Sequence, residues 1–248
     1  MPRALERENI PMTLAVGALT TFIKNHRDFW NVTCPDLSKA LKVVNNGLRA
    51  LPLRVPLGTE NRAVAGPLGT AVDYYIGWMT GASLLDQTER MAKLNEDARL
   101  ITGLVSARLV TLRNKARLSS PELENLGQLS LVLAHVESAF RTGNRLFIPP
   151  TAGLKHPKNR TTGDATFDAW LREQAPAGRV AEWLALAEQV RALPILWRGA
   201  IYNPVFGGYP PLITGSDGDL FTEGTLYDAK CSMDTFDGDA IRQLLTAS

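Results

Sequence analysis

The sequence has little cysteine and no long apolar run. Its two cysteines, Cys34 and Cys231, cannot form a disulfide framework or a four-thiolate zinc site, so we expect a protein of the reducing cytoplasm. No apolar stretch approaches the roughly 18–20 residues that cross a bilayer, which argues against a membrane span. The first eight residues mix both charge signs and lack an apolar segment, so they do not read as a secretory signal.

The rest of the composition is ordinary for a folded protein. The chain has 248 residues, of which 45% are hydrophobic and 21% charged, enough to bury the core of one large domain or two small ones. The net charge of +2 hides an asymmetry, because residues 101–160 are strongly basic and residues 214–248 strongly acidic. A basic segment suits a polyanion and an acidic cluster suits a hard cation, although solvated surfaces have the same composition.

Hydrophobic periodicity predicts helices through the first two thirds of the chain. Between Leu94 and Leu112 apolar residues recur every three or four positions, as they do along one face of a helix. The stripe continues from Leu126 to Phe140, with Ser120 as the predicted N-cap and Gly143 as a left-handed C-terminal cap. Further helices are predicted within residues 13–29, 37–51, 68–85, 167–173 and 179–193, with breaks at 66–69 and 149–163.

Residues 212–232 have the pattern of strand, turn and strand. Thr222-Glu223-Gly224 is the predicted hairpin turn between a strand that begins at Asp219 and a second strand over residues 225–230. Side chains alternate faces along a strand, so Asp228 and Lys230 share a face that Asp219 can reach across the hairpin. Two carboxylates beside an ammonium group suit Mg²⁺ or Mn²⁺ better than zinc, which is the outline of phosphodiester hydrolysis. A solvent-facing cross-strand ion pair is the simpler interpretation of the same residues.

The spacing of Asp219, Asp228, Ala229 and Lys230 resembles the signature of the PD-(D/E)xK nuclease superfamily, and the residues around it resemble the RecB-like branch. The resemblance covers residues 203–247 and departs from the family at two places, where Gly218 replaces a proline and Ala247 replaces a tyrosine. It implies Asp219 and Asp228 as metal ligands, the Ala229 carbonyl as a third ligand, Lys230 as the catalytic lysine and Gln243 as a supporting polar group.

The family also supplies an acidic residue from an upstream helix. Glu182 and Glu188 are both candidates, because they flank the apolar face of the same predicted helix. Glu188 is favoured since it lies closer to the strands in sequence. For contacts to nucleic-acid phosphates the candidates are Arg108, Arg113, Lys115, Arg117, Lys155, Lys158 and Arg160.

The expected fold class is α+β. A mostly helical region with a basic segment and a linker covers residues 1–165, and a small PD-(D/E)xK-like core of sheet and helix covers residues 166–248. The expected function is a cytoplasmic nuclease that uses Mg²⁺ or Mn²⁺ to hydrolyse DNA, with DNA favoured over RNA. Because the chain stops where the family has a further strand, the alternative is a non-catalytic nucleic-acid-binding or assembly protein on a degenerate core. Self-association and a protein partner are both left open.

Overall fold

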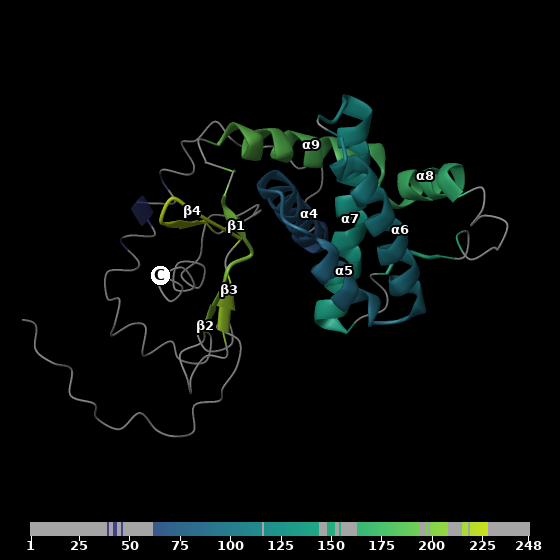
Figure 1. Ribbon diagram of the computed structural model, residues 1–248, viewed down its shortest axis with the longest axis horizontal. Coiled ribbons are helices and arrows are strands. Elements are labelled where there is room, and N and C mark those ends of the chain that lie inside the picture. The colour runs from purple at the N-terminus through teal and green to yellow at the C-terminus, as the bar shows by residue number, and fades with distance from the viewer. Residues whose placement is uncertain are drawn as a thin grey trace, which may run out of the picture. The chain divides into compact units, whose positions relative to one another are not determined.

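The computed structural model describes most of the chain between residues 62 and 227 (Figure 1). The described residues are 39, 42–43, 46, 62–115, 117–143, 148–151, 154, 163–193, 197, 199–207, 215–217 and 219–227. The chain divides into two compact units, one made of residues 51–203 and 219–234 and the other of residues 1–50, 204–218 and 235–248. In the described part of the chain, no helix has the length and apolar character needed to cross a bilayer.

Helices dominate the larger unit, as the periodicity predicts. Helix α7 is central, because α4, α6, α8 and α9 all pack against it, and Figure 1 shows it between α4 and α6. Helix α9 also packs against α4. The helices are α4 (Arg62–Thr80), α5 (Leu85–Ala92), α6 (Glu96–Arg113), α7 (Ser120–Thr142), α8 (Gly163–Gln174) and α9 (Ala177–Ala192).

The two predicted apolar stripes form much of the core. In α6 the buried positions include Ala98, Ile101, Val105, Leu109 and Leu112, which confirms the stripe predicted there. In α7 the stripe from Leu126 to Val136 is also buried. Phe140, the last predicted member, is 43% exposed, so the apolar stripe leaves the core before α7 ends.

The start of α7 differs by one residue from the prediction. Ser119, not Ser120, is the N-cap, and its backbone nitrogen and its hydroxyl both donate to Glu122 Oε2 at 2.8 Å. Glu122 also pairs with Lys115. These contacts form a capping box, which satisfies backbone donors that a helix start leaves free. The C-terminal prediction is confirmed, because Gly143 ends the helix with a left-handed φ of 65°.

The break predicted at Gly66–Gly69 is wrong. These residues lie inside α4, with Pro67 in its second turn. Leu68 is almost completely buried, and the apolar residues that follow it in α4 join the core. Burial against neighbouring helices therefore outweighs the weak local preference of glycine and proline for a break.

A small antiparallel sheet completes the larger unit. Its strand order is β1-β4-β5, with β1 at Ile201–Tyr202, β4 at Leu220–Thr222 and β5 at Thr225–Tyr227. The predicted hairpin is confirmed, because Leu220 pairs with Tyr227 and Thr222 with Thr225. Its turn residues Glu223 and Gly224 both have positive φ, 50° and 75°, as a two-residue type I′ turn requires. The described residues thus combine a mostly helical region with a small antiparallel sheet, which is an α+β fold.

The smaller unit is described in three short pieces. Strands β2 (Val205–Gly207) and β3 (Gly215–Asp217) pair antiparallel, with Phe206 opposite Ser216. Residues 39, 42–43 and 46 are helical, in agreement with the helix predicted over residues 37–51.

Candidate functional site

Asp219 lies at the junction of the three strands in the larger unit. It directly precedes β4, one residue outside the strand on which it was predicted. Its backbone nitrogen donates to the Tyr227 carbonyl at 3.2 Å, and its own carbonyl accepts from the backbone nitrogen of Asn203 at 3.0 Å. The backbone of Asp219 is thus held from the β1 side and the β5 side together. The other predicted members of the site, Asp228, Ala229, Lys230 and Gln243, lie outside the described residues.

Helix α4 brings a second acid, Asp73, close to Asp219. Tyr202 on β1 donates its hydroxyl to Asp73 Oδ2 at 2.9 Å. The other carboxyl oxygen, Oδ1, is buried and has no hydrogen-bond partner among the residues that the structure describes. Burial and then repulsion by the Asp219 carboxylate raise the pKa of Asp73 to about 8. The structure therefore brings together two acids that are far apart in the sequence.

A glycine on α4 makes room for the tyrosine that contacts Asp73. A Cβ atom at Gly77 would lie 2.9 Å from the Cε1 and Cζ atoms of Tyr202, closer than real Cβ contacts. Gly77 lies one helical turn after Asp73, so the two positions face the same side of α4. The ring of Tyr202 consequently rests against bare helix backbone while its hydroxyl reaches the carboxyl group.

Charged groups of α7 also act on Asp73. Glu137 accepts a hydrogen bond of 2.5 Å from the Tyr74 hydroxyl and forms an ion pair with Arg141. The negative charge of Glu137 raises the pKa of Asp73, and the positive charge of Arg141 lowers it, both less than burial does. Asp73 is thus a largely buried acid whose charged form is disfavoured in the protein without a cation.

The residues present fit a hard cation. Across the described ranges, no three His, Cys, Asp or Glu side chains are grouped so as to hold a metal ion. Asp73 and Asp219 nevertheless offer carboxylate oxygens, the ligands that Mg²⁺ and Mn²⁺ prefer. A buried carboxyl oxygen without a hydrogen-bond partner is rare in folded proteins, and Asp73 Oδ1, which has none among the described residues, offers a cation a ligand once the carboxyl group has lost its proton. A third acid, Asp228, directly follows Tyr227 in the sequence.

The two glutamates considered as the upstream acid are occupied by arginines of their own helix. Glu188 is exposed on α9, and both of its carboxylate oxygens accept from Arg191 at 2.7 Å. Glu182 accepts from Arg179 at 2.6 Å. Asp73 on α4 is a helical acid that interacts electrostatically with Asp219. One signal in the sequence could have identified it, since Asp73 is a single acid within the otherwise uncharged run from Ala63 to Thr80.

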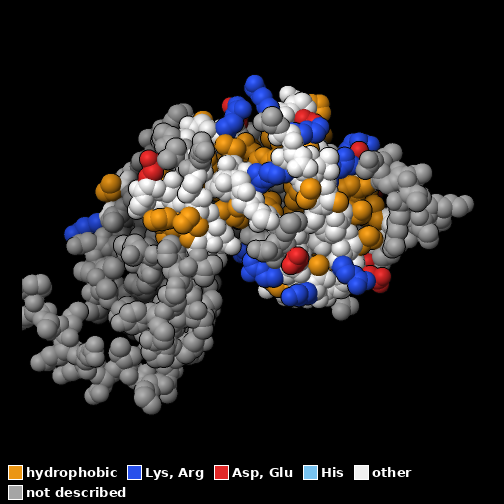
Figure 2. Space-filling model, in the orientation of Figure 1, with side chains coloured by type: hydrophobic (Ala, Val, Ile, Leu, Met, Phe, Trp, Pro, Cys, Tyr) orange, Lys and Arg blue, Asp and Glu red, His pale blue; other side chains and the backbone are white. Residues whose placement is uncertain are grey.

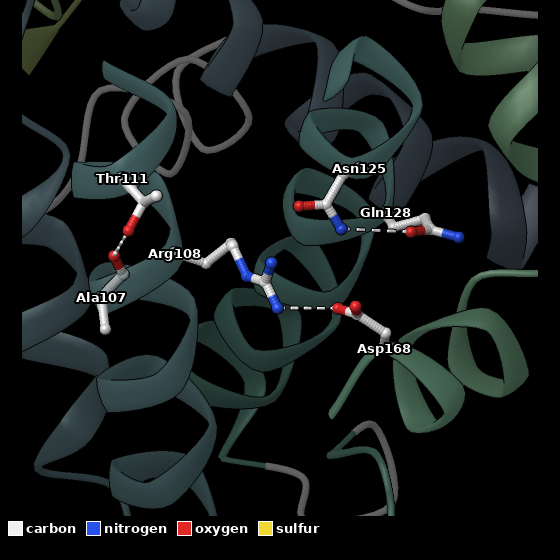
Figure 3. Close-up of polar contacts among 6 residues, drawn as sticks. All are labelled: Ala107, Arg108, Thr111, Asn125, Gln128 and Asp168. Carbon is white, nitrogen blue, oxygen red and sulfur yellow. Dashed lines mark hydrogen bonds and ion pairs between the residues drawn. The ribbon is translucent and has the colours of Figure 1, made fainter. Parts of the chain in front are cut away.

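Arg108, a predicted phosphate contact, joins two helices of the larger unit. It extends from α6 to α8, where its Nη2 atom donates to Asp168 Oδ1 at 2.8 Å (Figure 3). On the neighbouring α7, the amide of Asn125 donates to Gln128 at 3.4 Å. Arg108 and Asp168 are both partly buried, so the ion pair contributes to helix packing.

Two further predicted phosphate contacts also have partners within the protein. Arg113 lies over the ring of Trp78, 4.0 Å from its centroid, and donates to the carbonyls of Trp78 and Ala82 at the end of α4. Lys115 pairs with Glu122 in the capping box of α7. Arg117 is exposed, whereas Lys155, Lys158 and Arg160 lie outside the described residues. Figure 2 shows Lys and Arg side chains scattered over the visible face of the described part, with no single basic patch there.

Comparison with protein-family models, with curated proteins and with solved structures finds no match to this chain.

Proposed function

We propose that the protein is a nuclease that depends on Mg²⁺ or Mn²⁺ and hydrolyses phosphodiester bonds of DNA. One observation carries the proposal: Tyr202 donates its hydroxyl to Asp73 and pairs in the sheet with Leu220, the residue after Asp219, and the carboxylate of Asp219 repels that of Asp73. A buried carboxyl group repelled by a second acid lowers the stability of a folded protein, and such groups with raised pKa values are often found at functional sites. A nuclease-like core of the PD-(D/E)xK type is part of this proposal.

Each residue has a defined role in the proposed site. Asp73, Asp219, Asp228 and the Ala229 carbonyl would hold the cation. When bound, the cation would polarise a phosphoryl oxygen and lower the pKa of a coordinated water. Lys230 would stabilise the negative charge that develops on the phosphate.

The substrate would be held by basic residues outside this acidic pair. Arg117 is exposed and stands in the basic segment, and Lys155, Lys158 and Arg160 belong to the same segment in sequence. Arg108, Arg113 and Lys115 already have partners within the protein, so they would contribute less to DNA binding. Exposed lysines and arginines bind phosphates by displacing counterions, which makes such binding dependent on salt.

Cleavage of a labelled DNA duplex and of single-stranded DNA tests the proposal. We expect cleavage with Mg²⁺ or Mn²⁺, none in EDTA, and a loss of at least about 100-fold in Asp219→Asn and Lys230→Ala proteins whose unfolding curves match the parent. If the parent binds DNA but takes up no metal and cleaves nothing, the non-catalytic binding or assembly protein is the correct interpretation.

A second pair of variants identifies the helical acid. Asp73→Asn and Glu188→Gln each replace one carboxylate with an amide of the same shape. We expect Asp73→Asn to lose cleavage and Glu188→Gln to keep it, because the Asp73 carboxyl group interacts with Asp219 whereas both carboxylate oxygens of Glu188 accept from Arg191. The reverse result would place Glu188 in the site and remove the observation that carries the proposal.

A further inference from the structure

Tyr202 is attached to both acids of the candidate site. Its backbone belongs to β1, where it pairs with Leu220, the residue after Asp219. Its side chain reaches α4, where the hydroxyl donates to Asp73 Oδ2. Tyr202 therefore connects the chain segment that carries Asp219 with the helix that carries Asp73.

The ring and the hydroxyl of Tyr202 have separate roles. The ring packs against Gly77, where a Cβ atom would meet its Cε1 and Cζ atoms at 2.9 Å. These contacts depend on the shape of the ring and not on its hydroxyl. The hydroxyl donates to Oδ2 and so fixes which of the two carboxyl oxygens of Asp73 is left without a partner.

We propose that Tyr202 is the positioning residue of the cation site: its hydroxyl holds Oδ2 of Asp73 so that Oδ1 is presented as a cation ligand together with Asp219. The inference rests on the proposed function, because it needs a divalent cation at the acidic pair. Hydrogen bonds to the outer oxygen of a ligating carboxylate orient the ligand, and their loss weakens metal binding about 10- to 100-fold. In this role Tyr202 acts through Asp73 and not by contact with the cation.

The substitution Tyr202→Phe separates positioning from packing, because it keeps the ring and removes the hydroxyl. Mn²⁺ binding to the full chain, followed by electron paramagnetic resonance, gives a readout independent of cleavage. We expect Tyr202→Phe to bind Mn²⁺ about tenfold more weakly. In cleavage assays the half-saturating Mg²⁺ concentration should rise by a similar factor, with the rate at saturating Mg²⁺ within about twofold of the parent.

A matched control and a double variant complete the experiment. Tyr75→Phe removes a hydroxyl from α4 two residues after Asp73 and should leave Mn²⁺ affinity within about twofold. Asp73→Asn should weaken Mn²⁺ binding, and adding Tyr202→Phe to it should weaken binding no further, because the hydroxyl acts through Asp73. Additive losses in the double variant would contradict the inference.

The failures of the two proposals can be told apart. Unchanged Mn²⁺ affinity in Tyr202→Phe, with weakened affinity in Asp219→Asn, would overturn the role of Tyr202 and leave the proposed function intact. Unchanged affinity in Asp219→Asn would instead overturn the cation site itself. Unfolding of Tyr202→Phe would also count against the inference, because a positioning role requires that the ring alone keep β1 against α4.

Discussion

Gly127 on α7 faces the indole ring of Trp183 on α9. A Cβ atom at position 127 would lie 2.6 Å from Cε3 of that ring. Trp183 is fully buried, donates from Nε1 to the Ala71 carbonyl at 3.0 Å and meets the ring of Tyr75 edge-on at 5.3 Å between centroids. The absence of a side chain on α7 thus allows one tryptophan to join α4, α7 and α9.

This relationship predicts that Gly127→Ala destabilises the protein. The clash with a fixed, buried ring should cost about 1–3 kcal/mol and outweigh the gain in helix propensity of about 1 kcal/mol. Gly103→Ala is the matched control, because Gly103 is exposed on α6 and nothing lies within 4 Å of a Cβ built there. Urea unfolding should show opposite signs for the two variants, and equal stabilities would contradict the packing described.

A second prediction concerns stability and pH. Because the pKa of Asp73 is raised to about 8, the folded protein keeps this proton between about pH 4 and pH 8, where the unfolded chain has lost it. Stability should therefore fall as pH rises through this window, by up to about 1.4 kcal/mol per pH unit. Asp73→Asn should be less sensitive to this rise, as measured by urea unfolding in EDTA at several pH values. If the free energy of unfolding changes with pH in the same way in the parent and in Asp73→Asn, the prediction is wrong.

A third prediction concerns the capping box of α7. The hydrogen bond from Lys115 and those from Ser119 lower the pKa of Glu122 to about 2. Because the pKa of Glu122 is lower in the folded protein than in the unfolded chain, its carboxylate stabilises the fold at pH values above about 4.5. This stabilisation is lost as the pH falls from about 4.5 towards 2. Glu122→Gln should lose less stability than the parent on acidification from pH 6 to pH 3, measured by thermal unfolding. Glu124→Gln, two residues later, should follow the parent.

A fourth prediction tests the bridge between α6 and α8. Arg108→Ala, Asp168→Ala and the double variant form a cycle whose coupling energy should be about 0.5–1 kcal/mol, because both side chains are only partly buried. Since Asp168 occupies the guanidinium, Arg108→Ala should weaken DNA binding less than Arg117→Ala does. A larger loss in Arg108→Ala would show that DNA displaces Asp168.

The features that the sequence predicts well are those set by neighbouring residues. The stripe from Leu94 to Leu112 and the turn at Glu223-Gly224 depend on residues a few positions apart, and the structure has both. The left-handed cap at Gly143 is similarly local. In each case the periodicity or the conformational preference of glycine is sufficient to determine the element.

The features that escape prediction depend on distant partners. Asp73 contacts Tyr202, which is 129 positions away, and no local pattern pairs them. Gly66 and Gly69 suggest a break in the helix, although Leu68 between them is buried in the core. The need for a glycine at position 127 becomes clear only from its contact with Trp183, on another helix. The low helix propensity of glycine is a weak effect compared with burial, so the sequence alone does not show whether a glycine ends a helix or lies within it.

The larger unit is interrupted in sequence between Asn203 and Asp219, yet these two residues are hydrogen-bonded at 3.0 Å. In the order of the chain, residues 204–218 are therefore an insertion between two strands, β1 and β4, that pair with each other. Such junctions tolerate excision or replacement of the inserted stretch. A chain in which a short glycine linker closes this junction would be a minimal scaffold that retains Asp73, Tyr202 and Asp219 within a single continuous body.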